Sequence, residues 1–174
     1  MERIFISYKR ADKDIVFHIK DRIEAAVGKD ECWIDMDGIE SDAVFANVII
    51  KAIKQAEVFL FMYSKTHSKI IDFENDWTIK EITFAQKKKK RIVFVNIDQS
   101  PLEDWFELMF GTKQQVDATL PDRLNKLIDD IKAWLEIPEE DKLFYSAEEI
   151  LNQLEKKRFG NINDPFFARD RRYF

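Results

Sequence analysis

Short hydrophobic runs and amphipathic stretches alternate along most of this 174-residue chain. The runs are rich in Ile, Val and Phe and have the length of buried strands, whereas the stretches between them place apolar residues at helical spacing. A parallel sheet with crossover helices produces this alternation, because helices cover both faces of its strands. We therefore expect an α/β protein. Its predicted strands span residues 3–8, 32–35, 57–64, 91–98 and, more weakly, 113–118.

Helical patterns fill the gaps between these strands. The first runs from Asp12, a residue type that favours the N-cap, to Val27, with Gly28 as its stop. The others begin near Asp42, span 75–86, and run from Leu120 or Pro121 to Ile137, with at most a short helix within 100–110. The expected inward residues are Ile15, Ile19, Ile23 and Ala26 on the first, Phe45, Val48, Ile49 and Ile53 on the second, and Leu124, Leu127, Ile131 and Leu135 on the last.

This order of elements predicts a flavodoxin-like, doubly wound fold. Five parallel strands with flanking helices take the order 2-1-3-4-5 by default, because crossover connections are right-handed. The predicted domain covers residues 1–137. Residues 138–174 then form a short C-terminal extension with one helical pattern at 147–157.

Composition limits the classes of partner. The net charge is −5, so the chain as a whole does not attract nucleic acid. Cys32 is the only cysteine and the two histidines are far apart, so we expect no disulfide and no metal site. The start MERIFISYKR reaches charge too soon for a signal peptide, and no apolar run approaches the roughly 18 residues of a membrane span. We therefore expect a cytoplasmic protein without a nucleic-acid or membrane partner.

One charged residue interrupts the helical pattern of NDWTIKEITFAQ, residues 75–86. Its apolar residues form one broad arc on a helical wheel, and Glu81 falls inside that arc, one turn after Trp77. Burying a carboxylate is unfavourable unless a partner or a chemical role compensates for the lost hydration. Two interpretations stay open from the residues alone: a structural carboxylate paired with a lysine or a backbone amide, or a functional one.

Further candidates lie where ligands of doubly wound sheets bind, beyond the carboxyl ends of the first and third strands. Ser7, Tyr8 and Arg10 end or follow the first strand, and Ser64 ends the third. The four glycines are scattered and build neither a dinucleotide fingerprint nor a phosphate loop. Basic and aromatic side chains would therefore have to hold any nucleotide bound here.

Four separated segments resemble the TIR (Toll/interleukin-1 receptor) domain family. FISYKRAD is similar to the first box of the family, WIDMDGIESDAVF to its BB loop, VFLFMYS to its third strand, and DWTIKEI to the tryptophan–glutamate segment of TIR domains that hydrolyse NAD. The segments fall in order on the predicted elements, which makes the resemblance specific. It covers about residues 1–137.

The resemblance implies that Glu81 is the catalytic glutamate of an NAD+ nucleosidase, with NAD as substrate and no cofactor. The nicotinamide of NAD is already cationic and leaves as a neutral base, so the second carboxyl group of ordinary glycosidases is unnecessary. Glu81 would then oppose the positive charge that develops on the ribose. Tyr8 and Arg10 would hold the nucleotide by stacking and by pairing with its phosphates, with Phe45 and Trp77 as pocket walls.

The same resemblance implies products and partners. The products are nicotinamide and ADP-ribose, or a cyclic or rearranged ADP-ribose that signals to a downstream effector, as in bacterial antiphage systems such as Thoeris. The acidic loop from Asp35 to Asp42 is expected to dock on a second copy and build a homo-oligomer, with Lys87–Arg91 as one acceptor of opposite charge.

Three other functions compete with this interpretation. A TIR interaction module would only assemble partners and would not need Glu81. A nucleoside deoxyribosyltransferase-like enzyme would also place a glutamate on ribose but would act on free nucleosides. The pair Asp35 and Asp37 resembles the motif of haloacid-dehalogenase-type phosphatases, yet that motif normally ends the first long strand, whereas this pair follows a short second strand.

Overall fold

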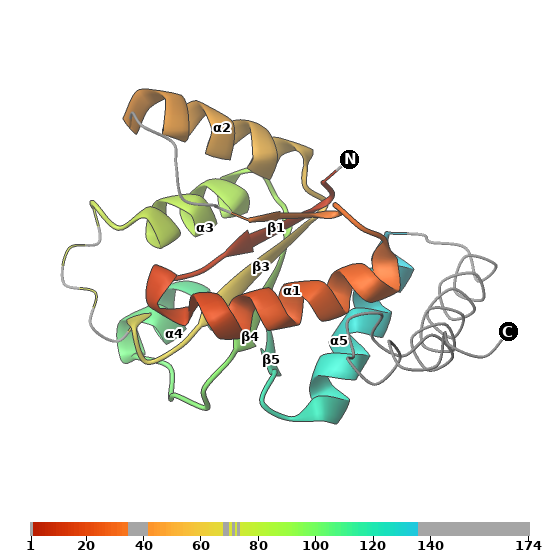
Figure 1. Ribbon diagram of the computed structural model, residues 1–174. Coiled ribbons are helices and arrows are strands. Elements are labelled where there is room, and N and C mark those ends of the chain that lie inside the picture. Colours follow the sequence, from red (N-terminus) through yellow and green to blue (C-terminus); the bar gives the residue numbers. More distant parts are fainter. Residues whose placement is uncertain (1, 35–41, 68–69, 71, 73, 136–174) are drawn as a thin grey trace, which may run out of the picture. The chain divides into compact units, whose positions relative to one another are not determined.

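The computed structural model describes residues 2–34, 42–67, 70, 72 and 74–135, without the side chains of residues 42–45. The described part is one five-stranded sheet between two layers of helices (Figure 1). All the strand pairs are parallel, and the strand order is β2-β1-β3-β4-β5. The predicted fold class and strand order are therefore confirmed.

The strands are short and buried toward the centre of the sheet, as the apolar runs predict. Their bounds are β1 Ile4–Ser7, β2 Cys32–Ile34, β3 Val58–Tyr63, β4 Arg91–Asn96 and β5 Gln114–Asp117. Every residue of the central strand β3 is buried, whereas the edge strand β5 has no fully buried residue. This difference explains why β5 gave the weakest strand signal in the sequence.

The helices connect the strands and divide between the two faces of the sheet. Their bounds are η1 Arg10–Asp12, α1 Lys13–Val27, α2 Asp42–Gln55, α3 Trp77–Lys87, α4 Asp104–Phe110 and α5 Pro121–Trp134. Helices α1 and α5 cover one face, and α2, α3 and α4 cover the other (Figure 1). Each helix predicted within residues 1–137 is present, including the short one within 100–110.

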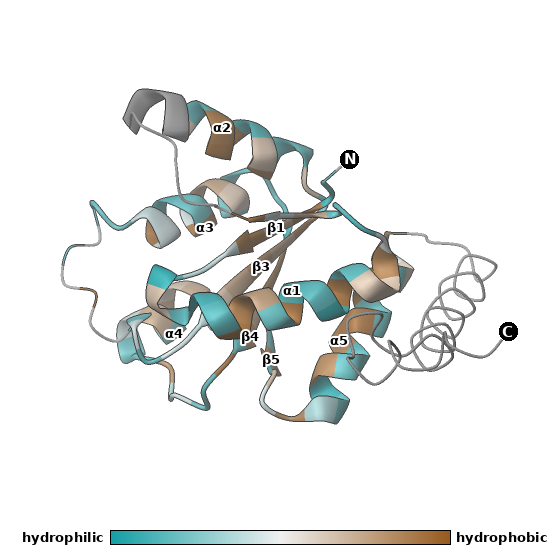
Figure 2. Ribbon diagram, viewed as in Figure 1, coloured by the Kyte–Doolittle hydropathy of each residue, from teal (hydrophilic) through white to brown (hydrophobic). Residues whose placement is uncertain are grey.

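The two faces of the sheet carry different cores because side chains alternate along each strand. Toward α1 and α5 the sheet presents aliphatic residues such as Ile6, Leu60 and Val95. Toward α2, α3 and α4 it presents aromatic ones, including Phe5 and Phe61. Hydrophobic colour dominates the central strands, whereas the helices alternate between hydrophobic and hydrophilic residues (Figure 2).

Helix α1 docks in a different rotation from the predicted one. Ile15 was expected to face inward but is 42% exposed, and Val16 is fully buried in its place. Ile19 and Ile23 are buried as expected, and Val27 continues the same stripe. Adjacent residues are about 100° apart on a helix, so the inward stripe 16, 19, 23, 27 turns Ile15 outward. On α2, Val48 is likewise more exposed than predicted, while the predicted stripe of α5 is buried in full.

Part of the lysine run at residues 87–90 makes contacts that stabilise the fold. Lys89 has a φ of 55°, and the amides of Lys89 and Lys90 bond to the carbonyls of Gln86 and Ala85, which is the Schellman arrangement of a helix end. The Lys90 ammonium donates to the Lys54 carbonyl at 2.7 Å and to the Ala56 carbonyl at 2.6 Å, where α2 ends. Cations here complement the carbonyl ends of two helices.

Residues 136–174 lie outside the described part, so the predicted C-terminal extension stays a prediction. Within the described ranges, none of the helices has the length and hydrophobicity needed to span a membrane.

Candidate active site

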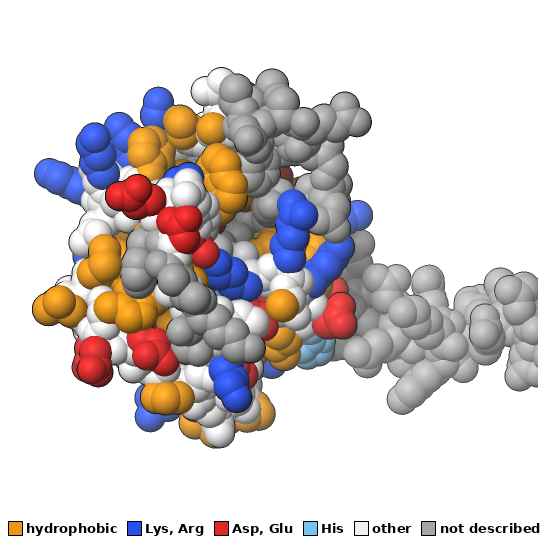
Figure 3. Space-filling view, turned by 90° about the vertical axis from the view of Figure 1, so that its left-hand side faces the viewer, with side chains coloured by type: hydrophobic (Ala, Val, Ile, Leu, Met, Phe, Trp, Pro, Cys, Tyr) orange, Lys and Arg blue, Asp and Glu red, His pale blue; other side chains and the backbone are white. Residues whose placement is uncertain are grey.

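The carboxyl ends of β1 and β3 meet at the point where the strand order reverses, because the chain places β2 on one side of β1 and β3 on the other. Open α/β sheets bind ligands at such points. Helix α3 begins on the same side of the sheet and contacts both strands. On the face at which α3 begins, hydrophobic, basic and acidic side chains lie in small mixed groups among those described (Figure 3).

Asp76 fixes the beginning of α3. As the N-cap, its carboxylate accepts from the Thr78 amide at 3.0 Å, the Ile79 amide at 3.3 Å and the Thr78 hydroxyl at 2.6 Å. The same carboxylate forms an ion pair with Lys9, which follows β1. A cap of this kind stabilises a helix by about 1 kcal/mol. The pair with Lys9 also ties the start of α3 to the end of β1.

Glu81 lies one turn into α3 and is buried, with 6% of its surface exposed. The hydroxyl of Ser7 donates to its Oε2 at 2.5 Å, and Ser7 itself is 1% exposed. Ser7 is the last residue of β1 and follows Phe5 by two positions, so its side chain points toward the layer that contains α3. The carboxylate within the apolar arc is therefore held by a neutral hydroxyl from the neighbouring strand.

A small hollow of about 180 Å³ lies beside Glu81, between α2 and α3. Ala46, Ile49, Ile50 and Ile53 of α2 and Trp77, Lys80, Glu81 and Phe84 of α3 line it. Its wall is mostly apolar, and Glu81 is the only carboxylate in it among the described residues. The volume is below the range of roughly 300–1,000 Å³ for drug-sized ligands, so it suits one ring of a larger molecule.

The structure brings together two of the five predicted site residues. Trp77, the first residue of α3, lines the hollow with Glu81. Tyr8 instead packs toward the α1 and α5 layer, where its ring meets Phe17 edge to face at 6.4 Å. Arg10 is exposed in η1 beyond the end of β1. The side chain of Phe45 lies outside the described part, so its place relative to Glu81 is untested.

A second polar cluster joins the ends of β1 and β3. The Asp12 carboxylate accepts from the hydroxyls of Ser64 at 2.6 Å and Thr66 at 2.7 Å. The Ser64 amide donates to Nδ1 of His67 at 3.3 Å. The Ser64 hydroxyl is therefore committed to Asp12 and is not activated by His67. This arrangement gives Ser64 a structural role rather than that of a nucleophile.

His67 is fully buried against Phe61 and Tyr63, with ring centroids 4.9 and 5.3 Å away. Because Nδ1 accepts the Ser64 amide, the neutral ring carries its proton on Nε2, and no described group bonds to that nitrogen. Burial, and then the positive charge of Lys9, lower the pKa of His67 from 6.5 to about 4. His67 is therefore neutral at pH 7.

The environment of Asp76 has the opposite consequence for charge. Burial raises the pKa of this carboxyl, but the hydrogen bonds from Lys9 and Thr78 and the charge of Lys9 together lower it by more. The pKa of Asp76 therefore lies below its ordinary value. Asp76 is therefore ionised at neutral pH beside the uncharged His67. His67 therefore adds no positive charge beside Lys9 and Asp76 at neutral pH.

Sequence patterns placed Ser7 at the ligand-binding end of the first strand but did not identify it as the partner of Glu81, and they did not single out Asp76 or His67. Ser7 and Glu81 are 74 positions apart, so only the strand order brings them together. For Asp76 a signal was present, since aspartate directly before an amphipathic stretch favours the N-cap. His67 carried no signal, because a histidine after a strand is equally compatible with an exposed loop.

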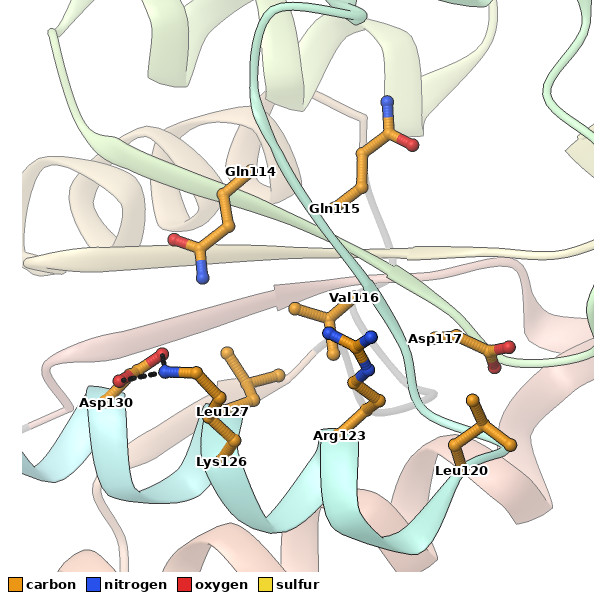
Figure 4. A pocket seen from close by; sticks show the side chains of 9 residues that line it. All are labelled: Gln114, Gln115, Val116, Asp117, Leu120, Arg123, Lys126, Leu127 and Asp130. Carbon is orange, nitrogen blue, oxygen red and sulfur yellow. Dashed lines mark hydrogen bonds and ion pairs between the residues drawn. The ribbon is translucent and has the colours of Figure 1, made fainter.

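A larger hollow of about 290 Å³ lies between β5 and α5, away from Glu81. Gln114 and Gln115 point to different sides of the edge strand, and Arg123 and Lys126 approach it from α5 (Figure 4). Lys126 pairs with Asp130 at 3.3 Å. Size alone would favour this hollow, but we place the chemistry beside Glu81 because a buried, positioned carboxylate is the stronger sign of function.

Metal ligands do not gather in the part of the chain that is described: no three His, Cys, Asp or Glu side chains lie close enough there to hold an ion. Asp35 and Asp37, the phosphatase-like pair, lie outside that part. The described lining of the hollow beside Glu81 combines this carboxylate with the aromatic rings of Trp77 and Phe84, the isoleucines of α2 and the side chain of Lys80, and Ser7 bonds to Glu81 from β1. The negative charge of Glu81 in this setting can stabilise a developing positive charge.

Comparisons with known proteins agree with this fold. The sequence model of the TIR domain family matches residues 4–128. Among solved structures, the crystal structure of the TIR domain of the Toll-related receptor TRR-2 from the lower metazoan Hydra magnipapillata matches with a TM-score of 0.55 and 18% identity. The match covers 76% of this chain and 99% of that one, and at this identity it shows the fold alone. A search of curated proteins found no match.

Proposed function

Because this chain belongs to the TIR domain family, we propose that it cleaves the nicotinamide–ribose bond of NAD+, with Glu81 as the catalytic residue. One observation carries the proposal: Glu81 is buried beside Trp77 in a mostly apolar hollow, and Ser7 holds it by a hydrogen bond of 2.5 Å. A buried carboxylate positioned in this way suits a role in charge stabilisation.

The chemistry needs little more than this carboxylate. The bond between C1 of the ribose and the ring nitrogen breaks, and its electron pair neutralises the pyridinium, so nicotinamide leaves without a proton donor. Positive charge then develops on the ribose, and the negative charge of Glu81 opposes it. Water then bonds to C1 of the ribose and loses a proton to the solvent, which gives ADP-ribose. Attack on C1 by a nucleophilic group of the same molecule gives a cyclic product instead.

Ser7 and Asp76 act as positioning residues in this scheme. Ser7 donates to Oε2 and fixes the orientation of Glu81, while Asp76 holds the first turn of the helix that carries it. Arg10, exposed beyond β1, is suited to pair with the diphosphate of the substrate. Tyr8 packs against Phe17 and is the least suited of the predicted binding residues.

The direct test measures nicotinamide release from NAD+ by chromatography with the purified full chain. Glu81→Gln keeps the size of the side chain and removes its charge, so we expect turnover to fall by roughly two to three orders of magnitude, the usual effect of losing one electrostatic stabiliser. Glu107→Gln is the matched control, because Glu107 is exposed on α4. Wild-type turnover by Glu81→Gln would contradict the proposal.

The wider role proposed for the product rests on the family resemblance of the sequence. The nucleotide product would signal to a separate effector in antiphage defence, within the cytoplasm. A deoxyribosyltransferase-like activity is distinguished by offering deoxynucleosides in the same assay: base exchange between them, with NAD+ left intact, would favour that enzyme instead.

Assembly is a second candidate function, and the surface of α4 favours it. TIR domains self-associate. Leu108 is 87% exposed and Met109 49% exposed on this helix, which leaves two large apolar side chains in water. The acidic loop 35–41 lies outside the described part, and Lys90 and Arg91 of its expected acceptor already contact carbonyls and the Trp134 ring. Lys88 lies over the Phe84 ring, so Lys87 and Lys89 remain as the acceptor in this proposal.

Self-association is tested together with activity. Specific activity should rise with protein concentration, because a contact between copies has to form first. Light scattering over a hundred-fold dilution reports the oligomer, and Leu108→Glu should shift it toward the monomer without lowering the melting temperature. A monomer of constant specific activity at every concentration would exclude this candidate.

A further inference from the structure

The hollow of about 290 Å³ between the edge strand β5 and helix α5 combines polar and apolar side chains (Figure 4). Val116 packs with the α1 and α5 layer, and Gln114, two positions earlier on the strand, extends toward the same side. Arg123 and Lys126 are three positions apart on α5 and so share a face of the helix. Leu127 lines the hollow beside them and is buried. The hollow therefore has an apolar wall with two cations from α5 and an amide from β5.

The charges of this lining are unevenly matched. Lys126 pairs with Asp130 one turn further along α5, with both carboxylate oxygens 3.3 Å from the ammonium. The carboxylate of Asp117 accepts from the amide of Thr119 at 2.9 Å and from its hydroxyl at 2.6 Å, at the turn after β5. In the described part of the chain, no side chain accepts a hydrogen bond from the Arg123 guanidinium. The donors of Arg123 are therefore available to an anionic ligand.

The lining favours a ligand with a single negative charge. An arginine binds a carboxylate through two parallel hydrogen bonds. The carboxylates of Asp117 and Asp130 border the same hollow and would repel a second negative charge, such as that of a phosphate monoester. Leu120 and Val116 add apolar surface for the body of the ligand. A cavity of about 150 Å³ holds benzene, so about 290 Å³ accommodates a ring or a branched chain together with its carboxylate.

We propose that the hollow between β5 and α5 is a binding site for a small organic monocarboxylate, which the Arg123 guanidinium holds with the Gln114 amide as a neutral donor beside it. Its described lining shares no residue with that of the hollow beside Glu81, so the inference goes beyond the proposed function and does not depend on it. A ligand that bonds to Arg123 and Gln114 at once links helix α5 to the strand at the edge of the sheet. Occupancy should therefore stabilise this edge.

Three probes with the same ring test the site: benzoate, a monoanion; benzamide, its neutral analogue; and phenyl phosphate, a dianion at about pH 8. Each is titrated into the isotopically labelled full chain at about physiological salt, where long-range attraction is screened. The readout is the backbone amide resonances of Gln114–Asp117 together with the Nε–H resonance of Arg123. Benzoate should bind with a dissociation constant of roughly 1–10 mM, as expected for so small a ligand, and more tightly than either of the other probes.

Substitutions at Arg123 separate the guanidinium from general electrostatics. Arg123→Gln removes the charge, so benzoate should bind about five- to ten-fold more weakly, the effect of losing one exposed charge-assisted contact, with benzamide unchanged. Arg123→Lys keeps the charge but loses the planar pair of donors, so its affinity should lie between those of the wild type and Arg123→Gln. Lys51→Gln is the matched control, because Lys51 is exposed on α2, which covers the other face of the sheet, and its loss changes the net charge equally.

The inference is overturned if benzamide binds as tightly as benzoate, if Arg123→Gln leaves the benzoate affinity unchanged, or if Lys51→Gln weakens it as much. Tighter binding of phenyl phosphate would also overturn it, because the site would then select for charge and not for a carboxylate. A benzoate titration to about 20 mM, above the expected range, that moves none of the Gln114–Asp117 resonances would do the same. Arg123 is exposed, so its variants should fold like the wild type, which thermal melting verifies.

Discussion

His67 should make the stability of the fold depend on pH in a window that begins at about 6.5, above the range in which most carboxylates titrate. Burial, and then the charge of Lys9, lower the pKa of this ring from 6.5 to about 4 in the folded chain. Between these two values the unfolded chain binds a proton that the folded chain does not bind. Stability is therefore complete above pH 6.5 and is lost as the pH falls toward 4.

The size of the effect follows from the two pKa values. A full separation of about 2.5 units, from 6.5 to about 4, corresponds to about 3 kcal/mol below both values. At pH 5 most of the unfolded histidine is charged and most of the folded one is neutral, so about 2 kcal/mol is lost relative to pH 8. That is a large part of the 5–15 kcal/mol typical of a domain.

Urea unfolding at a series of pH values measures this change as the free energy of unfolding. His67→Gln removes the titrating group, so its free energy should vary less between pH 8 and 5 by about 2 kcal/mol. His18→Gln is the matched control, since His18 is exposed on α1 and its variant should keep the wild-type dependence. Equal slopes for wild type and His67→Gln would refute the assignment of this pH dependence to the buried ring.

Two further predictions concern backbone and site. Lys89 has a φ of 55°, so Lys89→Gly should relieve roughly 1–2 kcal/mol of backbone strain. The glycine loses about 0.5–1 kcal/mol more chain entropy on folding, so the free energy of unfolding measured in urea should rise by about 0.5–1 kcal/mol. Lys88→Gly, where φ is −87°, should instead destabilise the fold. Ser7→Ala removes the donor to Glu81 and should lower NAD+ cleavage at least about ten-fold, with Ser7→Thr restoring most of it; equal rates for both variants would argue against positioning.

Much of the fold could be predicted because each element is marked locally. The apolar run of β3 and the apolar stripe of α5 were sufficient to predict these two elements. A strand buried on both faces leaves a continuous apolar run, and a helix buried on one side leaves a periodic stripe. The rotation of α1 could not be read in the same way. Ile15 and Val16 are adjacent and both apolar, so the pattern permits either one to face inward, and only docking against the sheet selects Val16.

The candidate site, like the fold, was predictable only where the signal is local in the sequence. Burial of Glu81 was predicted because the helical wheel places it within an apolar arc, and the structure confirms that burial. Its partner was not predicted, because the contact joins residues in different elements. His67 was missed for a related reason: a ring in a loop is buried only when the aromatic residues of a neighbouring strand receive it.

The identity of the partner of Glu81 bears on the chemistry. A buried carboxylate is most readily stabilised by lysine or arginine, but a cation at that distance would stand where positive charge develops on the ribose and would repel it. A serine hydroxyl offsets part of the lost hydration and fixes the carboxylate without cancelling its charge. In the proposed reaction the hydrogen bond from Ser7 therefore positions Glu81 and adds no positive charge of its own. If Glu81 is catalytic, Ser7→Lys, which places a cation against it, should abolish NAD+ cleavage in a variant that remains folded by circular dichroism. Wild-type turnover by a folded Ser7→Lys variant would leave Glu81 only a structural role.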